Sequence, residues 1–414
     1  MMPLESDAAQ GVVSATCCVG RREPGRPRSG RGVAVFNSFE TQLPPSAAAI
    51  SYPRMTPPTA SQTADAPTQP ASATGAAAPV APSEHTGPLL QARPDQTPPA
   101  AARRVMVTGG AGFVGRYVVR ELLRRGHTPV CLVRDAGRLL AHVPGPAQLR
   151  VEVVTGSLFD ADAVARAVEG ADAVIHLVGI ILESLRQTFR KVHVEGTRAV
   201  VRAAQQAGAG RFIHMSALGT RPDAVAPYHK TKYDAEQIVR GSGLEWTIFR
   251  PSIIHGPDGE FMRLMKAFVR PRPWHGPILA MPYFGSGEGK LQPVSVRDVA
   301  HVFVAALHTP ESIGKTYSLG GPEVYSWKEL YALCAQAIRG SVKRQMSVPI
   351  PVANLLALTV MKTPLVPKLL RFNRGQVAMS QEDSVCDRRP VEEAFGVTLR
   401  SFREELFEYA ELIP

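Results

Sequence analysis

The sequence has few cysteines, and their placement argues against a disulfide framework or a metal site. The five cysteines are an odd number with irregular spacing, and Cys131 falls in a predicted buried strand. Disulfide scaffolds and zinc sites are built from regularly spaced cysteine pairs. We therefore expect free thiols, no bound metal and a reducing compartment.

Long apolar runs are also lacking. None reaches the roughly 18–20 residues that a membrane-spanning helix needs. No signal-peptide pattern is present either, since "EPGRPRSG" follows Arg21 and Arg22 where an apolar segment would be required. We expect a cytoplasmic protein, with peripheral attachment at the inner face of a membrane as the alternative.

Lysine is absent from the first 190 residues, and no stripe of basic side chains is interleaved with aromatic ones. The formal net charge is +11, but arginine nearly balances the acidic residues over 1–103, so the positive charge belongs to the rest of the chain. Nucleic-acid-binding proteins concentrate basic residues on one face. We expect no nucleic-acid partner, and phosphate-bearing ligands explain the charge more simply.

Residues 1–103 contain little that forms a core. They are dominated by Ala, Pro, Ser, Thr, Gly and Gln, as in "TPPTASQTADAPTQPASATG". Such a composition cannot bury enough apolar surface to offset the entropy lost on ordering. We predict a disordered low-complexity segment, or the product of a wrongly assigned translation start.

From Arg104 onward, short apolar runs alternate with helical patterns. The runs are rich in β-branched residues, as in "RVMVT", "PVCLV", "DAVIHLV", "RFIHM" and "EWTIFR". This alternation predicts an α/β fold, a doubly wound parallel sheet of the Rossmann type. We expect its core over residues 104–256 and a smaller C-terminal substrate or lid region over 257–414, with elements returning to the core near 291–321.

The stretch "TGGAGFVG", residues 108–115, ends the first strand and opens the first helix. Gly109, Gly112 and Gly115 are spaced three apart, and the last three glycines also fit G-x-G-x-x-G. Glycines there permit a tight turn and let backbone approach a pyrophosphate, which the helix N-terminus attracts. Because a strand and a helix flank the pattern as required, it predicts dinucleotide binding.

The residue after the second strand bears on the choice of cofactor. A carboxylate at this place binds the ribose 2′-hydroxyl of NAD, whereas Arg134 offers a charged fork suited to the 2′-phosphate of NADP. Asp135 follows directly and is the alternative ribose ligand. We expect NADP(H) to be favoured over NAD(H).

A second constellation lies in "APYHKTKYDAE", where Tyr228 and Lys232 are four residues apart in a predicted helix. Side chains at i and i+4 share a helix face, and a nearby ammonium lowers the pKa of a phenol. Ser216 ends the preceding strand and is placed to bind the same substrate oxygen. These three residues predict a catalytic site for proton transfer coupled to hydride transfer. The alternative is that Tyr228 is an ordinary helix residue.

Taken together, these motifs resemble one protein family. The segments "TGGAGFVG", "HLVGI", "FIHMSALG", "YHKTK", "WTIFRPSIIHGP" and "LQPVSVRDVA" are similar to those of the short-chain dehydrogenase/reductase superfamily, in its extended or atypical branch, often labelled NAD-dependent epimerase/dehydratase. Within that branch, the chain is most similar to the dinucleotide-binding accessory subunit of respiratory complex I and its bacterial relatives. The resemblance covers residues 104–325 well and 326–414 loosely.

The resemblance also implies which residues contact the cofactor. They belong to the glycine-rich turn, the end of the second strand, the turns after the fourth and sixth strands, and the helix of the Tyr–Lys pair. The implied residues are Gly109, Gly112, Phe113, Val114, Gly115, Arg134, Leu177, Val178, Gly179, Lys232, Pro251, Ser252 and Ile253.

The chain departs from the family pattern in two places. Ser157 stands where many relatives have an aspartate that binds adenine. The gap between Ser216 and Tyr228 is about half of that in sugar-nucleotide epimerases, which puts a sugar-nucleotide substrate in doubt. His193 stands where relatives often have Asn, and we expect a polar contact near the site there.

Three further expectations concern residues outside these motifs. His214 lies within a strand and is expected to be structural. Trp274 and His275 are expected in a substrate loop, and Asp298 is expected to cap a helix.

Two functions from different classes are hypotheses at this point. The first is an NAD(P)(H)-dependent oxidoreductase acting on a small carbonyl or hydroxyl compound through Ser216, Tyr228 and Lys232. The second, which the resemblance implies, is a non-catalytic subunit that holds NADPH in a respiratory complex I or quinone-related assembly. A nucleotide-sugar epimerase or dehydratase is a third alternative.

Residues 346–374 contain an apolar helix-like piece, Val352–Met361, and a second piece, "LVPKLLRF", with Lys and Arg around it. Ten residues span only about 15 Å as a helix, so this segment cannot cross a bilayer. It predicts either a pair of helices that form a lid over the substrate cleft, or a surface that docks on a membrane interface or a membrane-bound partner.

Overall fold

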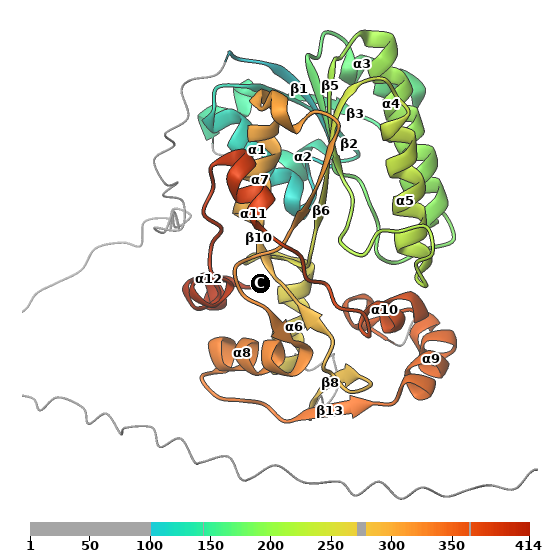
Figure 1. Cartoon of the computed structure of the whole chain (residues 1–414), viewed down its shortest axis with the longest axis vertical. Helices are drawn as coiled ribbons and strands as arrows, with labels where there is room; N and C mark the ends of the chain where they lie inside the picture. The colour runs from blue at the N-terminus through green and yellow to red at the C-terminus, as the bar shows by residue number, and fades with distance from the viewer. Residues whose placement is uncertain (1–100, 144, 271–278, 364–365) are drawn as a thin grey trace, which may run out of the picture. The chain divides into compact units, whose positions relative to one another are not determined.

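The computed structural model describes residues 101–143, 145–270, 279–363 and 366–414 (Figure 1). The segment 1–103, predicted to be disordered, lies outside the described residues except for its last three. Trp274 and His275, expected in a substrate loop, also lie outside them.

Seven parallel strands form the central sheet, in the order β11-β6-β5-β4-β1-β2-β3. They are β1 (Arg104–Thr108), β2 (Thr128–Val133), β3 (Glu152–Thr155), β4 (Ala173–His176), β5 (Arg211–Met215), β6 (Glu245–Pro251) and β11 (Lys315–Leu319). The chain winds outward from β1 to β3 and then in the other direction from β4 to β11. The predicted doubly wound sheet is therefore confirmed, and its strand order reverses between β1 and β4.

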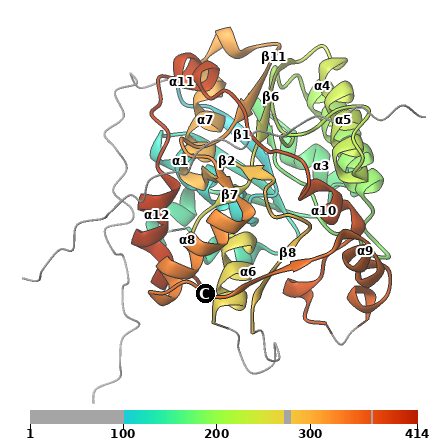
Figure 2. The ribbon, with the colours of Figure 1, turned by 60° about the horizontal axis from the view of Figure 1, so that its bottom comes forward.

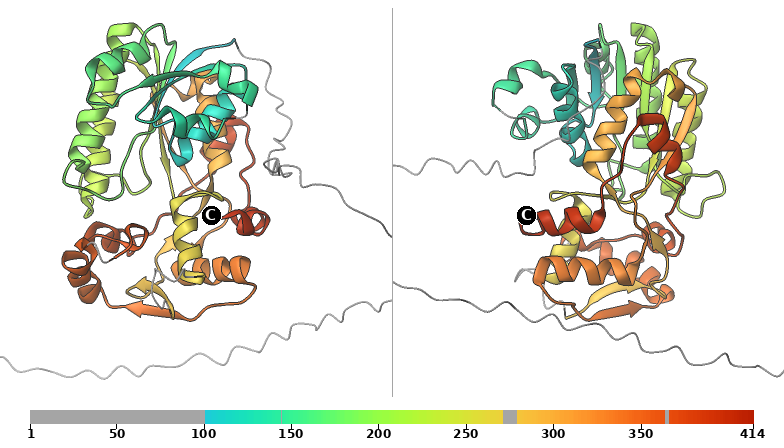
Figure 3. Two further views of the ribbon diagram at one scale, coloured as in Figure 1. Left: turned by 180° about the vertical axis from the view of Figure 1, so that it is seen from behind. Right: turned by 60° about the vertical axis from the view of Figure 1, so that its left-hand side comes forward.

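Helices cover both faces of the sheet (Figures 1 and 3). One face carries α1 (Phe113–Arg124), α7 (Val296–Ala305) and α11 (Arg389–Phe395), and the other carries α3 (Ala161–Val168), α4 (Gly196–Ala207) and α5 (Pro227–Arg240). Short helices α2 (Ala136–Leu140) and η2 (Gly145–Arg150) lie between β2 and β3.

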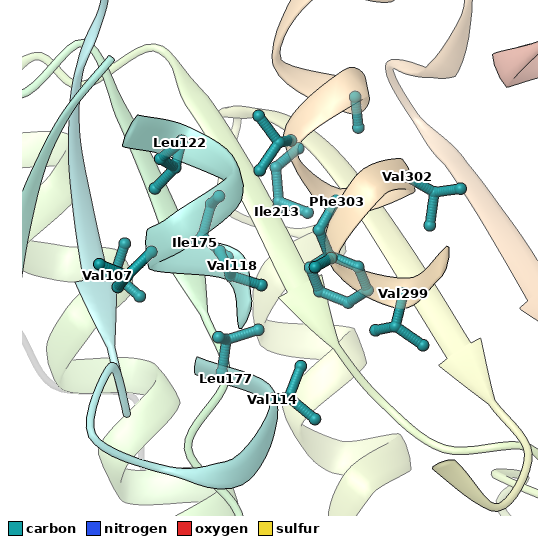
Figure 4. Packing of buried hydrophobic residues seen from close by; sticks show 14 of the residues in the cluster. Val107, Val114, Val118, Leu122, Ile175, Leu177, Ile213, Val299, Val302 and Phe303 are labelled. Carbon is teal, nitrogen blue, oxygen red and sulfur yellow. The ribbon is translucent and has the colours of Figure 1, made fainter. Parts of the chain in front are cut away.

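Alternate strand residues enter two separate cores. In β1, Val105 and Val107 belong to the cluster that includes Val118 of α1 and Phe303 of α7 (Figure 4), whereas Met106 belongs to the cluster on the other face. Because both faces are buried, the strands are apolar almost throughout, as a covered parallel sheet requires.

The C-terminal elements lie beyond the carboxyl ends of the strands and have a third core (Figures 1 and 2). The helices of this core are α6 (Glu260–Val269), α8 (Trp327–Arg339) and α12 (Phe402–Tyr409), and α9 (Ile350–Leu358) and α10 (Arg374–Met379) lie beside them in the chain. The short strands are β7 (Ile254–His255), β8 (Met281–Phe284), β9 (Lys290–Leu291), β10 (Val294–Ser295), β12 (Tyr325–Ser326) and β13 (Gln345–Val348). The stretch "SWKEL" has the residue spacing that predicts a capping box, and this is confirmed at the start of α8, where Ser326 and Glu329 cap each other's backbone N–H groups.

Two predictions about charged side chains differ from the structure. The spacing of Arg116, Arg120 and Arg124 in the sequence predicts that Arg116 lies on the polar face of α1, but it is buried and forms a salt bridge of 2.5 Å with Asp258. Asp298 does not cap α7, because Ser295 occupies the N-cap position and Asp298 instead forms an ion pair with Arg400. In both cases a charged partner far along the chain decides the position, which local sequence does not reveal.

The α-helix in the apolar segment is also shorter than the helical piece expected over Val352–Met361. Helix α9 ends at Leu358, where Thr359 leaves helical dihedral angles, and a 3-10 turn (Val360–Lys362) follows. In the second expected piece, the described residues form the 3-10 turn Lys368–Leu370 after Pro367. None of the helices in the described part of the chain combines the length and apolar character of a membrane span.

Candidate active site

The glycine-rich turn joins β1 to α1 and leaves the helix N-terminus open. Gly109 has φ +77°, which favours glycine, and the N–H of Gly112 donates to Gly109 O at 2.9 Å. A Cβ on Gly115 would lie 2.1 Å from Gly109 O, so α1 packs directly on the turn. Gly112 is the N-cap and places no side chain over the first amides of α1.

This turn fits the pyrophosphate of a dinucleotide. The first amides of a helix have no intrahelical partner and carry positive partial charge, so they bind anions. Val114 points into the core (Figure 4), which means that its expected contact would come from its backbone. The ring of Phe113 lies against Gly256 and Gly259, where an added Cβ would be 3.2 Å and 3.0 Å from it. Phe113 therefore connects the turn to the segment after β7.

Arg134 is exposed and directly follows β2, which is hydrogen-bonded to β1. The neighbouring Asp135 is the N-cap of α2, where its carboxylate accepts from Arg138 N at 3.0 Å. One oxygen of the Asp135 carboxylate is thus used in the cap, whereas the Arg134 side chain is exposed. Ser157 follows β3, and its hydroxyl oxygen accepts a hydrogen bond from the N–H of Phe159 at 3.2 Å.

The turn after β4, Leu177–Gly179, touches both the glycine-rich turn and α5. Leu177 N donates to Thr108 Oγ1 at 3.2 Å, and a Cβ on Gly109 would lie 3.3 Å from the Val178 side chain. A Cβ on Gly179 would lie only 3.0 Å from Lys232 Nζ. Gly179 therefore allows the ammonium of Lys232 to approach the backbone of this turn.

Lys232 is buried, and its ammonium donates to Met215 O at 3.0 Å. Burial lowers the pKa of Lys232 to about 8, while the charge of Glu236 on the same helix opposes that shift. The side chain thus links α5 to the end of β5, one residue before Ser216. Lys232 therefore lies close to both Gly179, which follows β4, and the end of β5.

Tyr228 lies one turn before Lys232 on α5, in an aromatic cluster. Its ring centroid is 5.8 Å from Phe189, 5.4 Å from His193 and 5.3 Å from His229. Burial raises the pKa of Tyr228 to about 12. This direction is opposite to the lowering expected from Lys232, because desolvation acts on the phenol while the ammonium is bonded to Met215.

Ser216 is buried at the end of β5, where its backbone N–H donates to Phe249 O at 2.7 Å. Its hydroxyl donates to Thr220 Oγ1 at 3.3 Å. In the described part of the chain no hydrogen bond joins Ser216 to Tyr228. The three expected catalytic residues thus share one edge of the sheet without a direct contact between their functional groups.

The turn after β6, Pro251–Ile253, is tied to the rest of the fold by its polar groups. Pro251 O accepts from Leu218 N at 2.9 Å, and Ile253 O accepts from Val294 N at 2.9 Å. Ser252 is buried, and its hydroxyl donates to Ser384 O at 2.9 Å. The Ser252 hydroxyl is therefore held by the C-terminal segment.

His193 occupies a π-helical segment, η3 (Arg190–Glu195), that leads into α4. Its Nδ1 is 2.9 Å from Thr231 Oγ1, and its Nε2 is 3.2 Å from Ile180 N. Nε2 also lies 3.2 Å from Ile180 O, and the tautomer of the ring determines which of its two nitrogens donates. His193 therefore connects the turn of Gly179 to the helix of Tyr228, a polar contact near the site.

Sequence reasoning missed a buried polar chain beneath this edge. His176 Nδ1 is 2.7 Å from Thr108 Oγ1, and His176 Nε2 is 3.1 Å from Thr197 Oγ1. His214 is buried beside it, with ring centroids 5.5 Å apart. Desolvation lowers the pKa of His176 to about 3, so the ring is neutral. Histidines near the ends of two adjacent strands, β4 and β5, were the available signal.

The chain also resembles known proteins. Residues 109–274 match the family model described as NAD(P)H-binding. The mitochondrial NADH dehydrogenase [ubiquinone] 1 alpha subcomplex subunit 9 of Arabidopsis thaliana is 31% identical over 291 residues, which cover 68% of this chain and 70% of that protein. The ceramide reductase of Caulobacter vibrioides is 34% identical over 248 residues, which cover 60% of this chain and 74% of that protein.

Solved structures agree with these sequence matches. The crystal structure of gox2253 superimposes with a TM-score of 0.57 at 27% identity, covering 75% of this chain and 97% of the other. The sequence matches and the structural match both cover the part of the chain that contains the glycine-rich turn and the helix of Tyr228 and Lys232. The chain belongs to the NAD(P)H-binding proteins of the extended short-chain dehydrogenase/reductase branch.

Proposed function

We propose that the protein is an NADPH-dependent reductase of a carbonyl compound, with Tyr228 as the proton donor. One observation carries the proposal above the others. Tyr228 and Lys232 lie on one face of α5, and the ammonium of Lys232 reaches Gly179 next to the glycine-rich turn. A nicotinamide bound across the reversal between β1 and β4 would lie close to this face.

The raised pKa of Tyr228 suits the role of a proton donor. A phenol with a pKa of about 12 is protonated at neutral pH and is able to donate its proton. The bound dinucleotide would supply the hydride to the carbonyl carbon. Tyr228 then gives its proton to the carbonyl oxygen, so that the product is an alcohol. Lys232 and Ser216 would orient the ribose and the substrate oxygen, respectively.

NADPH is the proposed cofactor because of Arg134. This exposed arginine follows β2, while the neighbouring carboxylate of Asp135 is used to cap α2. An arginine binds a 2′-phosphate through charge-assisted hydrogen bonds. The remaining expected contacts, from Gly109 to Ile253, lie on turns at the same edge of the sheet and are part of this proposal.

A second candidate function is a non-catalytic subunit that holds NADPH within a respiratory assembly. The observation that favours it is the similarity to subunit 9 of an NADH dehydrogenase. Under this alternative, residues 346–374 would contact a partner subunit or a membrane. Bound nucleotide would then act only by stabilising the folded state. A nucleotide-sugar epimerase is less well supported because of the short gap between Ser216 and Tyr228.

The decisive change is Tyr228→Phe, which removes one hydroxyl from α5. We expect the turnover of NADPH with aldehydes or ketones to fall by a factor of about 10² to 10⁴, the usual contribution of a positioned acid. The affinity for NADPH should stay within about twofold, because the ring and its aromatic contacts remain. Both are measured on one preparation, by NADPH oxidation and by fluorescence titration.

Tyr233→Phe is the matched control, since it removes a hydroxyl from the next turn of the same helix. It should leave turnover unchanged. If Tyr228→Phe turned over like the wild type, Tyr228 would be an ordinary helix residue. If the wild type bound NADPH but oxidised it with none of the carbonyl compounds, the non-catalytic alternative would stand.

A further inference from the structure

On helix α9 the large apolar side chains are exposed and the small ones are buried. Val352, Leu355 and Leu358 are 46%, 62% and 48% exposed, whereas the buried positions of the helix are Ala353 and Ala357. Residues three apart lie on one face of a helix, so the large side chains share a face opposite the alanines. A helix that packs on its own protein buries the large apolar residues instead.

Exposed apolar side chains also precede and follow α9 along the chain. Met346 in β13 is 53% exposed, and Val360 in the following turn is 42% exposed. We use the name docking face for the surface made by Met346, Val352, Leu355, Leu358 and Val360. Contiguous apolar side chains on a surface mark a place of interaction, in contrast to apolar residues that are exposed singly.

The chain segment that carries the docking face has charges of only one sign. Residues 341–381 contain three lysines and three arginines and no aspartate or glutamate. Lys368 and Arg374 are exposed in the described structure. An apolar face flanked by basic side chains is the combination that binds the headgroup region of an anionic bilayer.

We propose that the docking face lies on an anionic lipid surface, with Leu355 and Leu358 at the acyl boundary and the basic side chains among the lipid phosphates. This proposal is independent of turnover at Tyr228. We propose lipid as the binding partner because all charged side chains of residues 341–381 are basic and complement an anionic headgroup.

The docking face is also joined to the candidate active site by one short helix. Helix α10 packs on α9 (Figures 1 and 2). Asn373, the N-cap of α10, donates to Ile181 O at 3.3 Å in the loop after Gly179. A Cβ on Gly375 would lie 3.9 Å from Pro227, the first residue of α5. Attachment through α9 therefore brings the lipid surface near the helix of Tyr228.

The test is sedimentation of the full-length protein with lipid vesicles. We compare phosphatidylcholine alone with phosphatidylcholine that contains phosphatidylglycerol, at low and at high salt. The wild type should partition at least about tenfold more strongly into the anionic vesicles at low salt, and high salt should release it. Equal binding to both compositions, or none at low salt, would overturn the proposal.

Two double variants assign the binding to this face. Leu355→Ser with Leu358→Ser, and Lys368→Glu with Arg374→Glu, should each lower the partition coefficient at least about tenfold. Leu149→Ser with Leu412→Ser is the apolar control, since these leucines are 93% and 52% exposed elsewhere. Arg166→Glu with Arg202→Glu is the charge control on exposed positions of α3 and α4. Both controls should bind vesicles like the wild type.

Other occupants give different results. Sedimentation with native membranes but not with anionic vesicles would identify a protein partner and contradict the lipid assignment. A dimer in gel filtration that the Leu355→Ser and Leu358→Ser changes dissociate would identify a second copy of the chain. Fluorescence titration of NADPH on the same variants shows that they are folded, since the changed residues lie outside the glycine-rich turn.

Discussion

Burial sets the protonation of the titratable side chains on α5. It lowers the pKa of Lys232 to about 8 and raises the pKa of Tyr228 to about 12. At neutral pH Lys232 is a cation that donates to Met215 O, and Tyr228 is a neutral phenol. Under the proposed function the two residues would have separate tasks: Lys232 would bind through its charge and Tyr228 would donate a proton.

At the same scale, Arg134 is expected to decide the choice between the two nicotinamide dinucleotides. Arg134→Ala should remove most of a preference for NADPH over NADH, since a charge-assisted phosphate contact contributes on the order of 1.5–3 kcal/mol. Fluorescence titration with both cofactors measures the ratio of their dissociation constants. Arg138→Ala, which changes another exposed arginine in α2, serves as the control. NADH binding as tightly as NADPH to the wild type would rule the idea out.

At the scale of elements, the junction of β1 and α1 depends on the absence of side chains. Gly115 faces the backbone of Gly109 and Gly110, where a Cβ would lie 2.1 Å and 2.7 Å from the nearest atoms. The helix N-terminus can reach a ligand only if α1 stays at this distance from the turn. Backbone atoms, unlike the end of a flexible side chain, cannot move aside without distorting the turn.

Gly115→Ala should therefore abolish dinucleotide binding and lower the free energy of unfolding by about 1–3 kcal/mol, as overpacking does. Urea unfolding and fluorescence titration measure the two effects. Gly145→Ala is the matched control, because a Cβ there would meet no heavy atom within 4 Å. Unchanged NADPH affinity in Gly115→Ala would show that this turn does not hold the pyrophosphate.

The segment η3 shows how an irregular element serves the site. Its π-helical turn carries His193, whose ring joins Ile180 to Thr231. π-Helical turns are rare and frequently occur at functional sites. The irregular turn thus contributes a contact between the loop of Gly179 and the start of α5.

At the scale of the whole molecule, several buried histidines couple stability to pH. Desolvation lowers the pKa of His176 and His255 to about 3 and that of His193 to about 2, and it lowers the pKa of His214 well below its usual value. The unfolded chain binds protons at these side chains near pH 6.5, whereas the folded chain does not. The stability they confer is therefore present above pH 6.5 and is lost as the pH falls toward the folded values.

We expect the free energy of unfolding to decrease between pH 7 and pH 5, by up to about 1.4 kcal/mol per histidine and pH unit below pH 6.5. Urea unfolding at several pH values in this window measures the slope. Carboxylates add little there, because their usual pKa values lie lower. A free energy of unfolding that stayed constant down to pH 5 would show that these histidine rings accept protons in the folded state.

The sequence by itself determined the order of strands and helices, the glycine-rich turn and the helix of Tyr228 and Lys232. These features depend on residues close together in the chain, because alternation, turn chemistry and helical spacing are local. The capping box of Ser326 and Glu329 could be predicted for the same reason.

Tertiary structure decided what depends on partners that are distant along the chain. It paired Arg116 with Asp258, gave Asp298 an ion pair instead of a cap, and raised rather than lowered the pKa of Tyr228. It also turned the leucines of α9 outward. Burial and long-range contacts are properties of the packed chain, so local patterns cannot state which side chains lose water and which remain exposed.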